Sequence, residues 1–195
     1  MKLMKQALIA LGLAALAACA HNSEKSETTD NGVTEGTVVD ETETVSATTD
    51  GEVSAVLAAA NTAEIEMAQL AQQKATDPQV KAFADKMVAD HRANKKEGAD
   101  VAKSSDIDVQ KSNLSKQVAS DTEAKMKDLK VRAGSDFDQA YISSQITMHE
   151  ELLARLNDKY IPGAQDTQFR SYLEETRDHV QQHLDTAQAL QASLN

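Results

Sequence analysis

The chain has 195 residues, which suits one folded domain with appended segments, because domains usually contain about 100–200 residues. Aromatic residues make up 3% and Trp is absent, so a core must be built mainly from aliphatic and small side chains, a composition that favours closely packed helices. The formal net charge of -11 makes nucleic acid and bare anionic lipid poor partners.

Residues 1–18 have the layout of a secretory signal peptide. Lysines precede the apolar run Ala7–Ala18, which is too short to span a bilayer. The run ends in Leu16-Ala17-Ala18-Cys19, which resembles the lipobox of bacterial lipoproteins. This resemblance implies cleavage before Cys19 and attachment of lipid to its sulfur, so that acyl chains hold the protein at a membrane. An ordinary signal peptide with an incidental cysteine is the alternative.

Residues 19–50 carry the lipidated cysteine and a predicted tether. The segment is rich in Ser, Thr and acidic residues and contains no Leu or aromatic residue, so it cannot bury enough apolar surface to offset the entropy of ordering. We expect a disordered acidic spacer between membrane and domain. Ala20 follows the cysteine in place of Asp, and resemblance to the sorting signals of Gram-negative lipoproteins then implies an outer membrane protein that faces the periplasm.

Residues 51–195 are expected to form an all-α domain, because apolar residues there recur every three or four positions. The first helix should end near Ala75. Asp77 as N-cap and Pro78 at the first helical position predict a second helix, and the short connection predicts an antiparallel hairpin. The residues of this second helix expected to face inward are Val80, Phe83, Ala84, Met87, His91, Asn94 and Val101.

A weaker apolar pattern over residues 103–135 predicts a shorter helix within a long connection. Gly134 and Ser135 should end it, and Asp136 is expected to cap the next helix, which stops at Ile161-Pro162-Gly163. A last helix opens near Asp166. Two hairpins joined by one long connection indicate a ferritin-like antiparallel four-helix bundle with an extra shorter helix. Another helical bundle with an additional helix is the alternative.

The helical part contains four histidines, His91, His149, His179 and His183, each near the middle of its predicted helix. Helix midpoints lie at one height in an antiparallel bundle, so we expect these imidazoles to converge with Glu64 of the first helix. His179 and His183 are four residues apart and share a helix face. The residues expected to surround this set of histidines and Glu64, without binding the metal themselves, are Asp90, Gln145 and Glu175.

Imidazole and carboxylate groups are ligands for transition metals, which makes this layer a candidate metal site. A carboxylate-bridged di-iron site takes Glu-x-x-His from two helices, but the residues three positions before these histidines are Val88, Ile146, Thr176 and Val180. The pattern therefore disfavours di-iron chemistry and favours zinc or copper. Two alternatives stay open: a structural polar layer with hydrogen-bonded histidines, and histidines exposed on the surface.

Several short segments together resemble a large bacterial family catalogued as a domain of unknown function and as "predicted outer membrane protein". They are Ala63-Glu64-Ile65-Glu66-Met67, Val80-Lys81-Ala82-Phe83-Ala84, Met87-Val88-Ala89-Asp90-His91, Phe137-Asp138-Gln139-Ala140-Tyr141 with His149, and His183-Leu184. The resemblance implies a ferritin-like fold, an exported location and no established activity, and it points to Glu64, Asp90, His91, His149 and His183. Asp178-His179 departs from the pattern, where a proline-containing stretch is expected.

We therefore expect a lipid-anchored envelope protein that is not an enzyme and that binds a transition metal or protects the envelope against stress. The alternative is a structural or interaction module that docks an unidentified protein and uses its histidines only to order the core. An oxidase would need a carboxylate arrangement that the sequence does not contain.

Overall fold

The computed structural model describes residues 48–194. The expected signal peptide, Cys19 and the tether up to residue 47 lie outside the described residues. Within residues 48–194 the chain is all-helical and contains no strand, as predicted. None of the described helices has an apolar stretch long enough to cross a membrane.

Five helices of more than one turn account for most of the described chain. In order, the elements are α1 (Asp50–Lys74), α2 (Pro78–Ser104), α3 (Asn113–Val131), α4 (Gly134–Arg155), a π-helical turn η1 (Leu156–Tyr160), the single turn α5 (Ile161–Gly163) and α6 (Thr167–Leu194). The predicted shorter helix is α3, which lies in the connection between α2 and α4. The chain thus stays helical through η1 and α5 and ends this run at Gly163.

Capping residues determine where the first two helices begin. Thr49 and Glu52 form a capping box, in which each side chain accepts a hydrogen bond from the other residue's backbone N–H. Asp77 caps α2 by accepting hydrogen bonds from the next helical N–H groups, and Pro78 occupies the first position, as predicted. Helix α1 begins at Asp50, one residue before the part of the chain that was expected to be helical.

The start of α4 also differs from the prediction. Asp136 was expected to be the N-cap, but the helix begins at Gly134 after Ala133, with no side-chain cap. Gly134 has a φ of +58°, which glycine adopts without steric cost, so the helix begins three residues earlier than expected. Asp136 instead lies in the first turn and pairs with Arg132.

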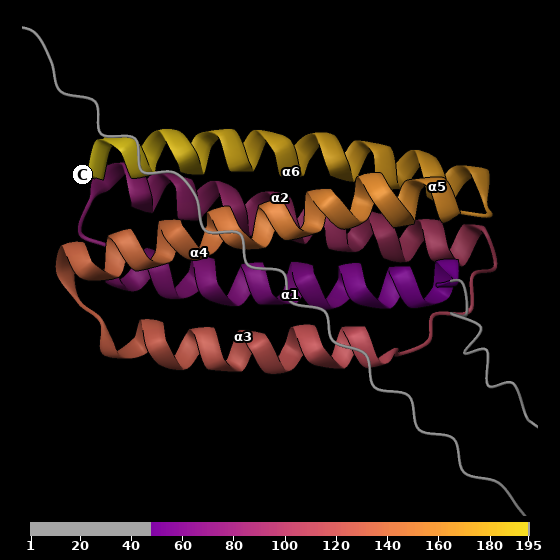
Figure 1. The fold of residues 1–195 in the computed structure, drawn as a ribbon, viewed down its shortest axis with the longest axis horizontal. Coiled ribbons are helices and arrows are strands. Elements are labelled where there is room, and N and C mark those ends of the chain that lie inside the picture. The colour runs from indigo at the N-terminus through magenta and orange to yellow at the C-terminus, as the bar shows by residue number, and fades with distance from the viewer. Residues whose placement is uncertain (1–47, 195) are drawn as a thin grey trace, which may run out of the picture. The chain divides into compact units, whose positions relative to one another are not determined.

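The long helices pack as two antiparallel hairpins (Figure 1). One hairpin consists of α1 and α2, and the other consists of α4 and α6. The connection that contains α3 returns the chain along the bundle, so α2 and α4 run in the same direction (Figure 1). Only Ser115, Thr122 and Leu129 of α3 are buried, so this helix packs along α1 as a cover on the bundle.

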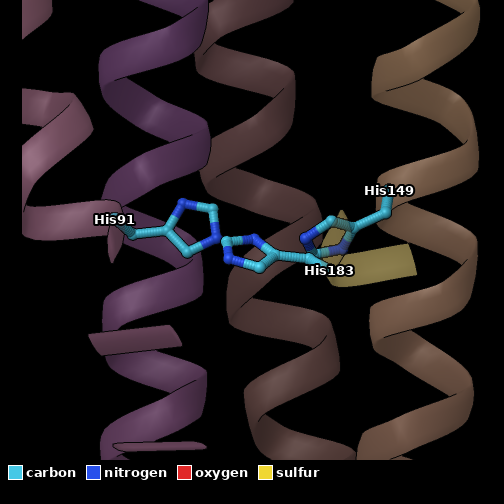
Figure 2. A group of neighbouring side chains, drawn as sticks. All are labelled: His91, His149 and His183. Carbon is cyan, nitrogen blue, oxygen red and sulfur yellow. The ribbon is translucent and has the colours of Figure 1, made fainter. Parts of the chain in front are cut away.

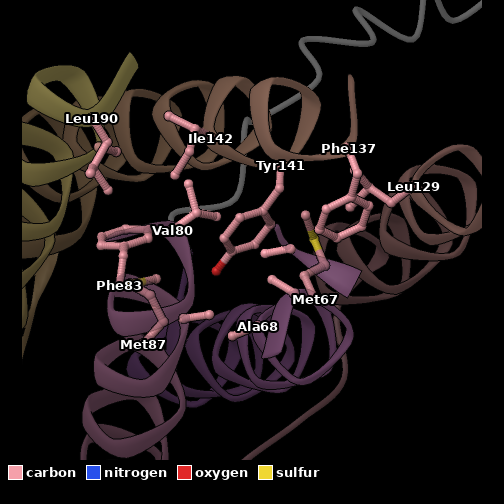
Figure 3. Packing of buried hydrophobic residues seen from close by; sticks show 14 of the residues in the cluster. Met67, Ala68, Val80, Phe83, Met87, Leu129, Phe137, Tyr141, Ile142 and Leu190 are labelled. Atoms are coloured by element: carbon pink, nitrogen blue, oxygen red, sulfur yellow. The ribbon is translucent and has the colours of Figure 1, made fainter. Parts of the chain in front are cut away.

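The apolar core consists of two clusters. Figure 3 shows one of them, in which Met67, Phe83, Phe137 and Tyr141 pack together from α1, α2 and α4. The other lies toward the start of α1 and includes Leu57, Leu156, Phe169 and Leu173. Every residue of α2 predicted to face inward is buried. Along α1, α2 and α4, the positions between the clusters carry buried polar residues, namely Asn61, Glu64, His91, Asn94, Gln145 and His149, and on α6 the buried Thr176 and His183 lie among residues of the second cluster.

Candidate metal centre

Three histidines from three helices meet in this polar layer. His91 comes from α2, His149 from α4 and His183 from α6, and their rings lie beside one another (Figure 2). Their exposed fractions are 6%, 2% and 2%. Because each residue lies near the midpoint of its helix, antiparallel packing brings the three to the same height. These three residues are called the histidine trio below.

The ring nitrogens of the trio are close enough to share one ion. One nitrogen of each ring lies within 4.8 Å of a nitrogen of both other rings, and the ring centroids are 5.2 to 5.9 Å apart. Nitrogen ligands at about 2.0–2.1 Å from a tetrahedral zinc ion lie about 3.3 Å from each other. The rings therefore need to approach by at most about 1.5 Å, which side-chain rotation supplies.

Hydrogen bonds determine which nitrogen of each ring carries the proton. His149 Nδ1 lies 2.8 Å from the backbone oxygen of Gln145, and a carbonyl only accepts, so Nδ1 donates. His183 Nε2 donates to Oδ2 of Asp90 at 2.8 Å. His91 Nδ1 donates to Oδ1 of Asn61, also at 2.8 Å.

The other nitrogen of each ring is buried and has no hydrogen-bond partner among the described residues. These atoms are His91 Nε2, His149 Nε2 and His183 Nδ1. A neutral imidazole that is protonated on one nitrogen presents a lone pair on the other. Since buried polar atoms normally find a partner, one free lone pair on each of three neighbouring rings is a set of donors suited to a metal cation.

Burial keeps the rings of His91 and His183 neutral. Burial and the neighbouring imidazoles of His149 and His183 lower the pKa of His91 well below its ordinary value. Burial also lowers the pKa of His183 to about 4, although the hydrogen bond to Asp90 opposes this shift. The neutral form is the one that binds metal, so at physiological pH both rings are ready to act as ligands.

Asp90 links the trio to the surface. Its half-buried carboxylate accepts hydrogen bonds from His183 and from Lys86 on the same helix. Burial disfavours the charged form, but the hydrogen bonds from Lys86 and His183 outweigh it and hold the pKa of Asp90 below its ordinary value. A carboxylate that accepts from the second nitrogen of a histidine is a common support for metal ligands, because it fixes the tautomer and the ring orientation.

A buried amide chain supports His91, and the sequence analysis did not identify its first member. Asn61 Nδ2 donates to Asn94 Oδ1, and Asn94 Nδ2 donates to Thr176 Oγ1, both at 2.8 Å. Tyr172 also donates its hydroxyl hydrogen to Asn94 Oδ1, at 3.0 Å. These bonds orient Asn61 so that its oxygen faces His91. The available signal was the place of Asn94 in the predicted inward row of the second helix.

Glu64 lies beside the trio but outside its donor set. Its Oε1 is 3.9 Å from His149 Nδ1, the nitrogen that donates to Gln145. Burial raises the pKa of Glu64, against the opposing effects of His149 and Gln145. Gln145 is also fully buried, and both polar atoms of its side chain lack a hydrogen-bond partner among the described residues.

The other two suspected residues of α6 are not brought into the trio. His179 is exposed and lies one turn before His183, where it lines a cavity next to the trio that is described below. Glu175 is exposed and does not line this cavity. The structure thus brings together three of the four histidines that the sequence analysis selected from the helical part.

A cavity of about 100 Å³ adjoins the trio. All three histidines and Glu64 line it, together with apolar side chains from several helices, which include Leu57, Leu152 and Val180. Charged residues of α3 and α4 complete the lining, namely Asp121, Lys125, Glu151 and Arg155.

The family model described as Domain of unknown function (DUF4142) matches residues 37–190, which is most of the chain. The chain belongs to this family. No curated protein and no solved structure matches it. The description of the family names no activity, so the chemistry of this DUF4142 chain has to be argued from its own geometry.

The donor set of this DUF4142 domain suits zinc or copper. Three neutral imidazoles are typical ligands of both metals. The neighbouring carboxylates of Glu64 and Asp90 lie outside the set of nitrogens within 4.8 Å of one another. The arrangement therefore differs from a carboxylate-bridged di-iron site, in which carboxylates bind both metals.

Proposed function

We propose that this protein is a lipid-anchored envelope protein whose helical domain binds one zinc or copper ion through His91, His149 and His183. Two observations carry the proposal: the three buried histidines bring ring nitrogens within 4.8 Å of one another, and each ring has one nitrogen without a hydrogen-bond partner among the described residues. Each ring is held by a hydrogen bond through its other nitrogen. Such preorganisation favours metal binding, because little side-chain entropy is lost when the ion binds.

We assign the domain a ferritin-like topology. Two antiparallel hairpins joined by a long connection, with α2 and α4 parallel, support this assignment. Metal sites in such bundles are built from side chains that project inward from facing helices, and the trio has this placement.

The proposed location rests on the N-terminal sequence. Residues 1–18 followed by Cys19 resemble a lipoprotein signal, and Ala20 favours the outer membrane, with the domain facing the periplasm. The test is the Cys19→Ala variant of the full chain expressed in a Gram-negative host. We expect the natural sequence in the outer membrane fraction with a mass increase from acylation, and the variant without that increase. An unmodified natural Cys19 would contradict the anchor.

The alternative is a polar layer that only determines how the helices pair. The hydrogen bonds from Asn61 through Asn94 to Thr176 favour it, because they join α1, α2 and α6 in one register without any ion. The trio argues against it. A purely structural layer that leaves three ring nitrogens unpaired loses free energy, about 1–3 kcal/mol for each buried unsatisfied group.

Titration of the metal-free full chain with zinc and with copper(I) tests the binding proposal. We expect one ion per chain, and loss of binding in His149→Gln, a substitution that keeps a polar side chain of similar size. The matched control is His179→Gln, which changes an exposed histidine and should keep the stoichiometry. Equal binding by both variants, with circular dichroism confirming that they are folded, would remove the trio as the site.

A further inference from the structure

We infer that the metal held by the histidine trio keeps one coordination position open to the adjoining cavity, and that an exchangeable water or small anion from solvent occupies it. This inference rests on the proposed function, because the position exists only when the metal is bound. An open coordination position distinguishes a reactive metal centre from a closed structural one, in which protein side chains supply all four ligands.

Neither neighbouring carboxylate is placed to be the fourth ligand. Oε1 of Glu64 lies 3.9 Å from Nδ1 of His149. This nitrogen donates to a backbone carbonyl and is therefore not the one that can bind metal. Asp90 likewise bonds Nε2 of His183, whereas the unpartnered nitrogen of that ring is Nδ1. Neither carboxylate belongs to the group of ligand atoms that lie within 4.8 Å of one another, which leaves three protein ligands.

The cavity supplies room for the fourth ligand. Its volume of about 100 Å³ exceeds the roughly 30 Å³ that one water takes in the liquid, so a water or a small anion fits. All three histidines line it, which places the cavity against the centre. Its lining also includes the exposed His179, so the cavity extends from the buried trio toward the protein surface.

Charge identifies the class of ligand. Three neutral imidazoles leave the full charge of a divalent ion uncompensated, and such an ion attracts anions or makes bound water more acidic. Lys125 and Arg155 line the cavity, but so do the carboxylates of Asp90, Asp121 and Glu151, so the ion itself is what attracts an anion. Small monovalent anions are therefore the expected exogenous ligands.

The test uses cobalt(II), which takes the same nitrogen ligands as zinc and absorbs visible light. The metal-free full chain is loaded with one equivalent of cobalt(II), and its visible spectrum is recorded while sodium azide is added. We expect a saturable spectral change with one azide per cobalt. A bound cobalt whose spectrum azide leaves unchanged would overturn the open position, whereas failure to bind cobalt, zinc or copper would overturn the proposed function itself.

Two variants make the result specific. Glu64→Gln should keep the azide response of the natural chain; if Glu64 were the fourth ligand, only this variant would respond. Leu152→Trp narrows the cavity from its wall and should weaken azide binding by about tenfold or more while cobalt stays bound, because a filled cavity excludes the ligand. Azide affinity equal to that of the natural chain in Leu152→Trp would contradict access through this cavity.

Discussion

At the scale of single residues, three hydrogen-bond acceptors give the histidine trio its chemistry. The carbonyl of Gln145, the carboxylate of Asp90 and the amide oxygen of Asn61 each accept from one ring nitrogen. The trio therefore presents unprotonated nitrogens at the same height in the bundle. Of these acceptors, Asp90 is the one whose side chain is partly exposed, so it can be substituted without leaving a buried cavity.

Asp90→Ala removes the acceptor of His183 Nε2. We expect metal affinity to fall by about 10–100-fold, the usual effect of losing such a support, because the tautomer and the orientation of the ring are no longer fixed. The control is Asp85→Ala, which removes an exposed carboxylate of the same helix that accepts only from Gln72. Competition titration with a chromogenic zinc chelator measures both. Equal affinities would show that Asp90 does not support the site.

The metal-free protein should lose stability as pH falls from about 6.5 toward 4. The pKa of His183 is lowered to about 4 and that of His91 lies well below 6.5, so the unfolded chain binds more protons in this window. The raised pKa of Glu64 acts in the opposite direction, but one carboxyl opposes two imidazoles. Urea unfolding at pH 7 and pH 5 measures the effect. A free energy of unfolding that is higher at pH 5 than at pH 7 would contradict the lowered pKa values of His91 and His183.

Sequence reasoning selected the trio and two of its supports, Asp90 and Gln145, but not the third, Asn61. The rows of inward positions and the helix midpoints were sufficient to select His91, His149 and His183. Asn61 was missed because its role depends on a side-chain rotamer and on a partner in another helix. His179 illustrates the same limit, since it lies at the edge of the buried row of α6 and only packing decides that it is exposed.

At the scale of elements, caps and close approaches position the helices that carry the trio. Asp50 at the start of α1 accepts hydrogen bonds from the backbone of Gln165 and Asp166, which joins the beginnings of α1 and α6. Asp138 of α4 accepts from the backbone of Thr76 and Asp77 in the turn between α1 and α2. These contacts determine how the two hairpins align, and hence the common height of the histidines.

Gly51 permits a close approach at the start of α1. A Cβ at this position would lie 2.0 Å from the backbone oxygen of Asp108, so Gly51→Ala forces the backbone to move. We expect a loss of about 1–3 kcal/mol in the free energy of unfolding, as for other overpacked sites. The control is Gly163→Ala, whose Cβ would meet nothing within 4 Å. The melting temperatures of both variants are measured by thermal unfolding. Equal melting temperatures would contradict the close approach of Gly51 to Asp108.

Helix boundaries were predictable where side chains form the caps. Asp77 and Pro78 gave the start of α2 correctly, because both residues act locally. The predicted start of α4 was wrong, because the chain enters this helix through the positive φ of Gly134, without a side-chain cap. No local sequence rule separates this case from capping by Asp136. The close approach of Gly51 to Asp108 depends on the long connection and has no local signal.

At the scale of the whole molecule, a polar layer divides the apolar core of the bundle in two. On α2 and α4 the two clusters flank His91 and His149, so the bundle buries its imidazoles near the midpoints of the long helices. Antiparallel order made this convergence predictable from sequence. The outward position of α3 was not predictable, because its weak apolar row is compatible with either an inner or an outer place.

Metal binding should stabilise the entire domain, since three helices supply the ligands. At free zinc about 100 times the dissociation constant, linkage gives about 2.7 kcal/mol. For a domain of this size, we expect the melting temperature to rise by roughly 5–10 °C. Differential scanning calorimetry with zinc, and with magnesium as the control cation, measures the shift. An equal effect of the two cations would contradict a nitrogen-ligand site.

The most direct test of a metal-binding trio is the metal content of the full chain purified from its native cells without chelators or affinity metals. The account predicts about one zinc or copper ion per chain by elemental analysis, and none in a variant that combines His91→Gln, His149→Gln and His183→Gln. A natural chain that carries neither metal, and that takes up neither when it is supplied, would contradict the account.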